Sequence, residues 1–145
     1  MNISTINCFE CVVDTVRNDT NQCYYVKTIQ DNSVKFTVPI SDRMFTSMNL
    51  NVGDSCFIFF NPSDVYVVKP SNKWSYASSN TFEGSLVERR ECKENSVVTM
   101  KVGENVTIQA KISNYVCDKM GLSMDDKLDV VIKSNQIMIA RNKSE

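Results

Sequence analysis

Six cysteines and no histidine define the reactive chemistry available to this chain. Cys8 and Cys11 have the C-x-x-C spacing of many zinc and redox sites, but they lie in a segment whose alternation predicts a strand. Residues three apart in a strand point to opposite faces, so the two thiols diverge. No second C-x-x-C follows, and a zinc site must recruit the isolated Cys23 and Cys56. We expect small buried or half-buried cysteines, with structural zinc or redox chemistry as the alternative.

Other catalytic signatures are also missing from the sequence. Without histidine the chain lacks the usual general base, and no serine or cysteine has a visible partner that activates it. The four glycines do not form a phosphate-binding loop. We therefore expect a protein that is not an enzyme.

Charge and hydropathy restrict the partners and the location. The formal net charge of the 145 residues is −1, and neither half is basic enough to indicate nucleic acid or an anionic membrane as a partner. No apolar run approaches the roughly 20 residues that cross a bilayer, and the first residues do not resemble a signal peptide. The expected location is the cytoplasm.

The elements that position these residues are indicated by an internal repeat. A shift of 72 residues places Val34–Ser41 on Val106–Ser113 and Phe60–Val68 on Ile132–Ala140, with apolar residues matching apolar residues. The start of each half, around Asn7 and Asn80, agrees at a shift of 73. The chain is therefore predicted to contain two small domains of one fold.

Each repeat predicts five short strands, with one helix between the third and the fourth. Ser41 and Ser113 are the expected helix N-caps. This order is typical of a small OB-type barrel, so the predicted class is all-β with short helices and two tandem five-stranded barrels. The predicted domains are 1–69 and 78–145, joined by a linker at 70–77. The predicted strands are 3–17, 23–29, 34–40, 55–60 and 65–68, then 82–91, 96–102, 106–112, 128–133 and 136–141.

Residues 120–140 resemble the closing segment of the molybdate-binding Mop domain, which reads roughly L-G-L-x-x-G-D-x-V-x-A-x-I-K-A-S-D-V-x-I-A. Each repeat of that family opens with S-A-R-N-x-L-x-G-x-V, and residues 4–13 and 77–86 occupy that place. The resemblance covers nearly the whole chain twice. The chain is thus similar to the two-repeat molbindins, which are tandem Mop (TOBE) domain proteins.

The resemblance implies a protein that stores molybdate or tungstate and uses no organic cofactor. In the family the anion lies at subunit interfaces, where the opening motif of one domain meets the closing motif of another, and two-repeat members resemble trimers. The implied site is physically reasonable, because a tetrahedral dianion that only accepts hydrogen bonds requires a ring of donors. We therefore expect a homotrimer that holds the oxyanion between its subunits.

Ten residues match or replace the family's ligand positions. The sequence departs from the motifs at Ile6, which stands at the arginine position, and at Pro62, which stands at the alanine and has no N–H. Lys133 is the one family cation that remains in these motifs. The candidate oxyanion ligands are Ser4, Thr5, Asn7 and Ser63 in the first repeat, and Ser78, Ser79, Asn80, Lys133, Ser134 and Asn135 in the second.

Other interpretations of the same residues are open. Asn7 and Asn80 recur at one repeat position, which is also expected if the fold needs a hydrogen bond there. An OB-type module binds nucleic acid or oligosaccharide through a basic, aromatic face, and Tyr24, Tyr25, Lys27 and Lys35 offer part of one, with Trp74 and Tyr76 as a further stacking surface. A third possibility is a degenerate module that acts as an oligomeric scaffold without a ligand.

Overall fold

The computed structural model of the chain describes residues 6–70 and 80–142. The first half contains β1 (Asn7–Asn18), β2 (Gln22–Thr28), β3 (Lys35–Pro39), α1 (Asp42–Met48), β4 (Ser55–Phe60), the 3-10 turn η1 (Pro62–Asp64) and β5 (Val65–Val68). The second half follows the same order with β6 (Asn80–Glu91), β7 (Asn95–Gly103), β8 (Val106–Ser113), α2 (Asn114–Met120), β9 (Lys127–Ile132), η2 (Ser134–Gln136) and β10 (Met138–Arg141). The all-β class with short helices is confirmed.

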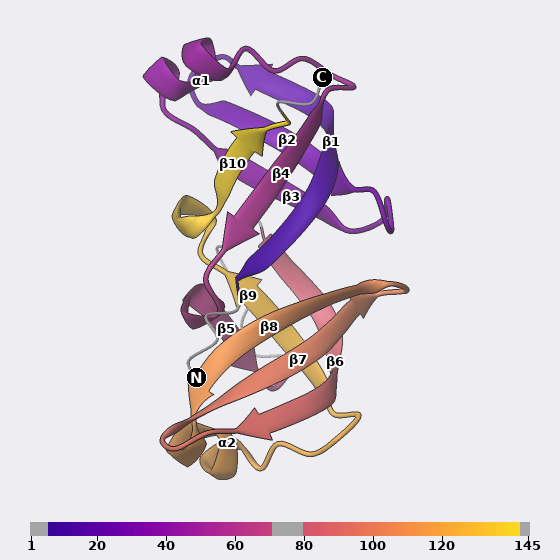
Figure 1. Cartoon of the computed structure of the whole chain (residues 1–145), viewed down its shortest axis with the longest axis vertical. Coiled ribbons are helices and arrows are strands. Elements are labelled where there is room, and N and C mark those ends of the chain that lie inside the picture. The colour runs from indigo at the N-terminus through magenta and orange to yellow at the C-terminus, as the bar shows by residue number, and fades with distance from the viewer. Residues whose placement is uncertain (1–5, 71–79, 143–145) are drawn as a thin grey trace.

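The two helices begin where the sequence predicted. Ser41 Oγ accepts a hydrogen bond from the Met44 N–H (3.3 Å), and Ser113 Oγ accepts one from the Val116 N–H (3.1 Å). These caps satisfy amide groups that the first helical turn leaves without partners. Figure 1 places α1 and α2 at opposite ends of the long axis of the molecule. None of the helices in the described residues is long and apolar enough to cross a membrane.

The strands form two sheets of five, and one edge strand of each sheet comes from the other half of the chain. The strand orders are β10-β4-β1-β2-β3 and β5-β9-β6-β7-β8. All pairs are antiparallel; β5 pairs with β9 and β10 pairs with β4. In Figure 1 the yellow β10 accordingly lies beside β4 in the upper half, although β9, which precedes it, lies in the lower half. The predicted boundaries at 69 and 78 therefore describe sequence repeats, and the sheets do not follow them.

A basic residue anchors the end of each exchanged strand. Lys69, just after β5, places its Nζ 3.2 Å from Oδ2 of Asp126 in the second half. Arg141, which ends β10 and lies 72 residues further along, donates from Nη1 to the carbonyl oxygen of Met48 at the end of α1 (2.8 Å). Both strands are thus tied at their ends to the half that receives them.

One hydrophobic core runs through both halves. The buried faces of both sheets contribute to a single cluster. At its centre, Phe36 of β3 lies 5.0 Å from Phe82 of β6, measured between ring centroids, and 5.6 Å from Phe9 of β1. Each half is small for an independent core, so this shared packing provides burial that neither half would have alone.

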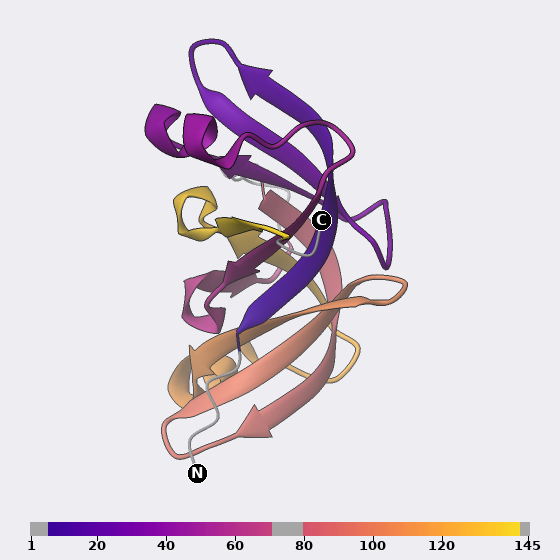
Figure 2. The same cartoon turned by 45° about the horizontal axis from the view of Figure 1, so that its top comes forward.

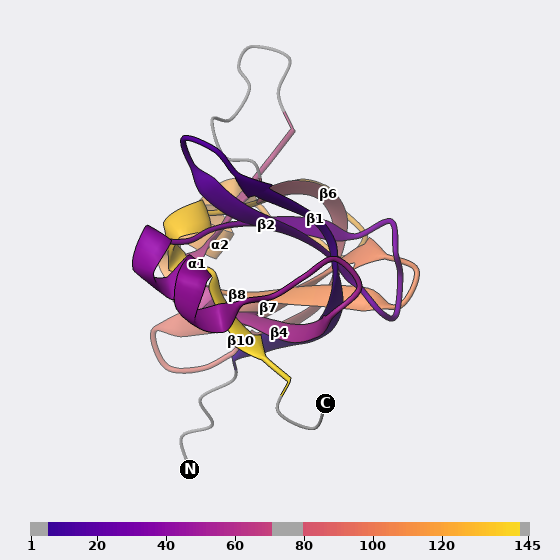
Figure 3. The same cartoon turned by 90° about the horizontal axis from the view of Figure 1, so that it is seen from above.

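Two hairpin turns also meet across the halves. The Asp31 carboxylate at the β2–β3 turn accepts hydrogen bonds from the Ser33 N–H and hydroxyl and from the Glu104 N–H at the β7–β8 turn. A Cβ on Gly103 would lie 2.6 Å from Asp31 Oδ2 and 2.6 Å from Val34 Cγ2. Figure 2 shows the purple and orange turns side by side, and Figure 3 shows them on the side of the long axis opposite the helices. Glycine at 103 permits this approach.

Candidate functional site

The structure describes six of the ten predicted oxyanion ligands. Asn7, Ser63, Asn80, Lys133, Ser134 and Asn135 lie at the starts of β1 and β6 or in the turns that follow β4 and β9. The other four, Ser4, Thr5, Ser78 and Ser79, lie outside the described residues. These six positions form two groups, one around Asn80 and one around Asn7.

Asn80 links the second sheet to the first. Its amide nitrogen donates to the carbonyl oxygen of Thr37 in β3 and to Ser134 Oγ, both at 2.8 Å. Its Oδ1 accepts from the Thr37 N–H, also at 2.8 Å. The Asn80 side chain is completely buried. Asn80 therefore pairs with the β3 backbone as a neighbouring strand would, and it joins the opening and closing segments of its own repeat.

Asn7 makes the equivalent link in the opposite direction. Its amide nitrogen donates to the carbonyl oxygen of Gln109 in β8 (2.9 Å), and its Oδ1 accepts from the Gln109 N–H (2.8 Å). Asn7 is 5% exposed. Thr37 and Gln109 are themselves 72 residues apart, so the two links are related by the repeat. These bonds agree with the interpretation that the fold requires a hydrogen bond from the asparagine at this repeat position.

The closing turns place further donors near these links. Lys133 and Asn135 are exposed on either side of the half-buried Ser134, and η2 lies against β3. Lys133 takes part in none of the ion pairs that the structure contains among residues 6–70 and 80–142. In the first repeat Ser63 is exposed on η1, which lies against β8. Only the group around Asn80 thus combines an ammonium group with hydroxyl and amide donors.

The cysteines do not form a metal or redox centre in the described part of the chain. Cys8 is exposed and Cys11 is buried, as the strand prediction requires. Burial raises the pKa of the Cys11 thiol to about 12 and that of the Cys56 thiol to about 11, so neither is a thiolate at neutral pH. No cluster of three or more Cys, Asp or Glu side chains suited to a metal occurs in these residues.

The predicted basic and aromatic face on β2 and β3 is partly occupied by the fold. Tyr24 is completely buried and stacks on Phe45, with ring centroids 5.2 Å apart, so it has no face to offer a base. Lys27 and Lys35 both approach the Asp14 carboxylate, at 3.6 and 3.7 Å. Asp14 was not identified from the sequence; it lies at the β1 irregularity, between Val13 and Thr15.

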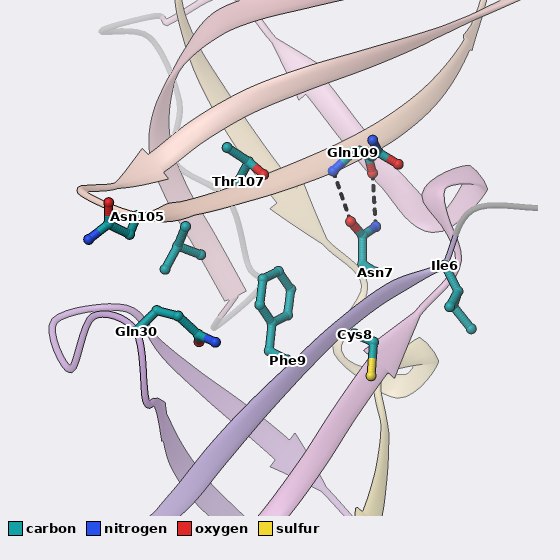
Figure 4. Close-up of a pocket in the computed structure, with 9 residues that line it drawn as sticks. Ile6, Asn7, Cys8, Phe9, Gln30, Asn105, Thr107 and Gln109 are labelled. Carbon is teal, nitrogen blue, oxygen red and sulfur yellow. Dashed lines mark hydrogen bonds between the residues drawn. The ribbon is translucent and has the colours of Figure 1, made fainter.

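The sequence also gave no sign of a cavity that lies beside Asn7. Residues of β1 line it together with residues of the β2–β3 and β7–β8 hairpins, among them Gln30, Asn105, Thr107 and Gln109. Figure 4 shows Phe9 pointing from β1 toward β8 between Gln30 and Asn7. Nothing in the periodicity of these segments indicates that the two hairpins meet, because the contact depends on the arrangement of the halves.

Comparison with known proteins agrees with the resemblance. The TOBE domain family matches residues 77–139, which cover the second repeat and the residues just before it. No curated protein matches the chain in sequence. Among solved structures, the chain is similar to the cytoplasmic molybdate-binding protein ModG in a crystal form with molybdate bound. The TM-score is 0.86 at 17% identity, and the match covers 98% of this chain and 100% of ModG. The chain therefore carries a TOBE match in its second half and has the fold of ModG over nearly its whole length.

Proposed function

We propose that this chain is a cytoplasmic, non-enzymatic protein that binds molybdate or tungstate for storage or homeostasis. The observation that carries the proposal is the match of the backbone, over nearly all of both chains, to a protein crystallised with molybdate. The TOBE match to residues 77–139 supports it independently of the backbone. We further propose that each half is an OB-type barrel closed by the exchanged strand, and that the tandem repeat runs through both domains.

We propose that the oxyanion binds beside the Asn80 link between the two sheets, with Lys133 as its cation. Molybdate presents only acceptor oxygens, and the Lys133 ammonium and the Asn135 amide are exposed donors beside this link. Ser134 Oγ accepts the Asn80 bond, so its own proton is available to donate elsewhere. Ser78 and Ser79 precede Asn80 in sequence and complete the predicted donor set. Asn7 and Ser63 lie at the other link, and neither motif of the first repeat supplies a cation; Ser4 and Thr5 precede Asn7 in sequence.

We propose that the complete site forms between copies of the chain, in a homotrimer. Two negative charges are costly to desolvate unless several fixed donors surround them. Among the described residues, Lys133 and Asn135 are the exposed donor side chains of the motif at the Asn80 link, which are too few to surround a dianion, so a second copy would supply the rest. This arrangement links ligand binding to assembly.

Calorimetric titration of the anion-stripped protein with molybdate, tungstate and sulfate tests the proposal. We expect saturable heat with molybdate and tungstate and none with sulfate, on an assembly that light scattering shows to be trimeric. Lys133→Ala should weaken binding by roughly ten- to a hundred-fold, because it removes one charge-assisted donor. Lys93→Ala is the matched control, since Lys93 is an exposed lysine just beyond the opposite end of β6 and should bind like the wild type.

The scaffold alternative is favoured by one observation, the bonds of Asn80. Both donor hydrogens of its amide are already used by Thr37 and Ser134, so its family position does not by itself supply a donor to an anion. An intact trimer that gives no heat with either molybdate or tungstate would refute the storage function and leave the scaffold.

A further inference from the structure

The outer face of the first sheet carries apolar side chains where β4 and β10 lie side by side (Figure 1). Phe57 and Phe59 of β4 point to this face, because Ile58 between them is completely buried in the core. The neighbouring positions of β10 are Met138, opposite Phe59, and Ala140, opposite Phe57. Met138 is 49% exposed, and the other three are half-buried. These four side chains form one apolar surface, here called the β4–β10 patch.

The sequence of β4 is typical of a strand that is covered on both faces. Residues 56–60 are all apolar, whereas a strand with one face in water alternates apolar and polar residues. At the equivalent positions of the second half, Asp129 and Val131 replace the two phenylalanines. The second sheet thus forms with a carboxylate and a smaller side chain on its outer face. The fold itself therefore does not require the aromatic rings of the patch, which indicates a partner outside the single chain.

The surroundings of the patch resemble the rim of an interface. Glu10 of β1 lies opposite Phe57, at the border of the patch. Arg141, at the end of β10, already donates to the carbonyl oxygen of Met48. Interface cores are depleted of charged residues and have a polar rim. A partner that covers the patch would remove apolar surface from water without having to desolvate a charge at its centre.

A second copy of the chain is the occupant that the position of the patch favours. Met138 follows Asn135 by three residues, so the patch borders on the exposed donors beside the Asn80 link. Lys133 and Asn135 are too few to surround a dianion, and the copy that supplies the remaining donors has to lie next to them. A copy in that place is in position to cover the patch. A closed ring of copies needs such a contact surface on each of them.

We propose that the β4–β10 patch is the surface through which copies of this chain pack against one another in the homotrimer. The proposal rests on the trimer and the oxyanion site proposed above, and it names the surface that brings a second copy to that site. The contact is apolar, so a charge placed within it should weaken assembly while the fold of the single chain persists.

Sedimentation velocity of the full-length protein over a series of protein concentrations tests the proposal. Met138→Glu should raise the concentration at which the trimer dissociates by at least about ten-fold, because a carboxylate would be buried without a partner. Met138→Leu keeps the surface apolar and should assemble like the wild type. Met44→Glu is the matched control, since Met44 is also 49% exposed but lies on α1 at one end of the long axis (Figure 1). Circular dichroism shows that each variant is folded.

Calorimetric titration of the same samples with molybdate separates this proposal from the oxyanion function. If the wild-type trimer binds no molybdate but Met138→Glu still dissociates it, the patch is the contact surface and the oxyanion function is refuted. The patch proposal is overturned if the wild type is monomeric at every concentration, if Met138→Glu assembles like the wild type, or if Met44→Glu weakens assembly equally. None of these three results depends on whether molybdate binds.

Discussion

The links made by Asn80 and Asn7 predict an unequal loss of stability when each asparagine is replaced by alanine. Asn80→Ala removes at least three hydrogen bonds, two to the Thr37 backbone and one to Ser134. Asn7→Ala removes two, both to the Gln109 backbone. The two side chains are buried to nearly the same degree, at 0% and 5% exposed, so the number of bonds is the main difference between them.

The expected magnitudes follow from this difference. A protein hydrogen bond contributes about 1 kcal/mol net, and a buried partner left without a bond costs about 1–3 kcal/mol more if water does not replace it. Asn80→Ala should therefore lower the free energy of unfolding by at least about 3 kcal/mol, and Asn7→Ala by at least about 2 kcal/mol. The gap of about 1 kcal/mol corresponds to roughly a fivefold change in the unfolding equilibrium.

Urea unfolding of the two variants and the wild type, at one fixed protein concentration, measures both values. Concentration is held constant because assembly would add to the apparent stability. Asn21→Ala, on an exposed turn between β1 and β2, is the control and should stay within about 0.5 kcal/mol of the wild type. A loss below about 1 kcal/mol for Asn80→Ala, or an equal loss for Asn7→Ala, would refute the view that these side chains act as structural links.

Four further predictions concern the contacts between the halves and the thiols. In the described sheet, β10 is the edge strand and pairs with β4. Deletion of β10 should therefore lower the hydrogen-exchange protection of β4 amides and leave that of β7 amides unchanged; unchanged protection in β4 would contradict the strand exchange. Gly103→Ala should lower the free energy of unfolding by about 1–3 kcal/mol in urea, because its Cβ would overlap Asp31 and Val34, and a neutral result would mean that the turns separate easily. Hydrogen bonds from Ser33 and Glu104 lower the pKa of Asp31 from 3.8. The stabilisation that the Asp31 carboxylate provides is therefore complete above pH 3.8 and is lost as the pH falls through the lowered pKa. The free energy of unfolding should accordingly fall less steeply with acid in Asp31→Asn than in the wild type. Iodoacetamide followed by mass spectrometry should label the exposed Cys8 and Cys92 in the native protein and leave Cys11 unlabelled, since burial raises the pKa of Cys11 to about 12.

The local elements were predictable because their signals are short in range. Ser41 and Ser113 mark the helix starts through an oxygen that bonds to an amide three residues later, and both helices begin there. The buried residues of β4 and β9 alternate along the strand at the same positions in the two halves. Such features depend on neighbouring residues alone, so a single sequence contains enough information to place them.

The exchange of β5 and β10 was not predictable by the same means. The two strands occupy nearly equivalent repeat positions, and the repeat alone does not indicate which sheet each one joins. Their assignment depends on where the preceding turn sends the chain, and on the anchors of Lys69 and Arg141, which act over 57 and 93 residues. Local propensity carries no information about contacts of this separation, so the repeat suggested two separate domains where the strands are shared.

The roles of Asn7 and Asn80 were not predictable from the sequence. They were identified because they match the opening motif of the family, and their recurrence at one repeat position fits a ligand and a structural link equally well. Their partners are backbone groups of Thr37 and Gln109, whose side-chain identity has no influence on the bond. A sequence therefore gives no trace of such a partner, and only the geometry separates the two roles.

Two differences between the halves stand at equivalent repeat positions. Asp31 and Gly103 occupy the same repeat position and touch each other, so two copies of either residue would fail there: two carboxylates would repel each other, and two glycines would lose the bond to the Glu104 N–H. Pro62 and Ser134 likewise occupy one position, and only the serine completes the bonding of its asparagine. A repeated fold can keep equal apolar cores in both halves, but residues that contact their own counterparts are free to become complementary. The two links between the sheets consequently differ in chemistry, with the Lys133 ammonium near Asn80 and an uncharged cavity beside Asn7.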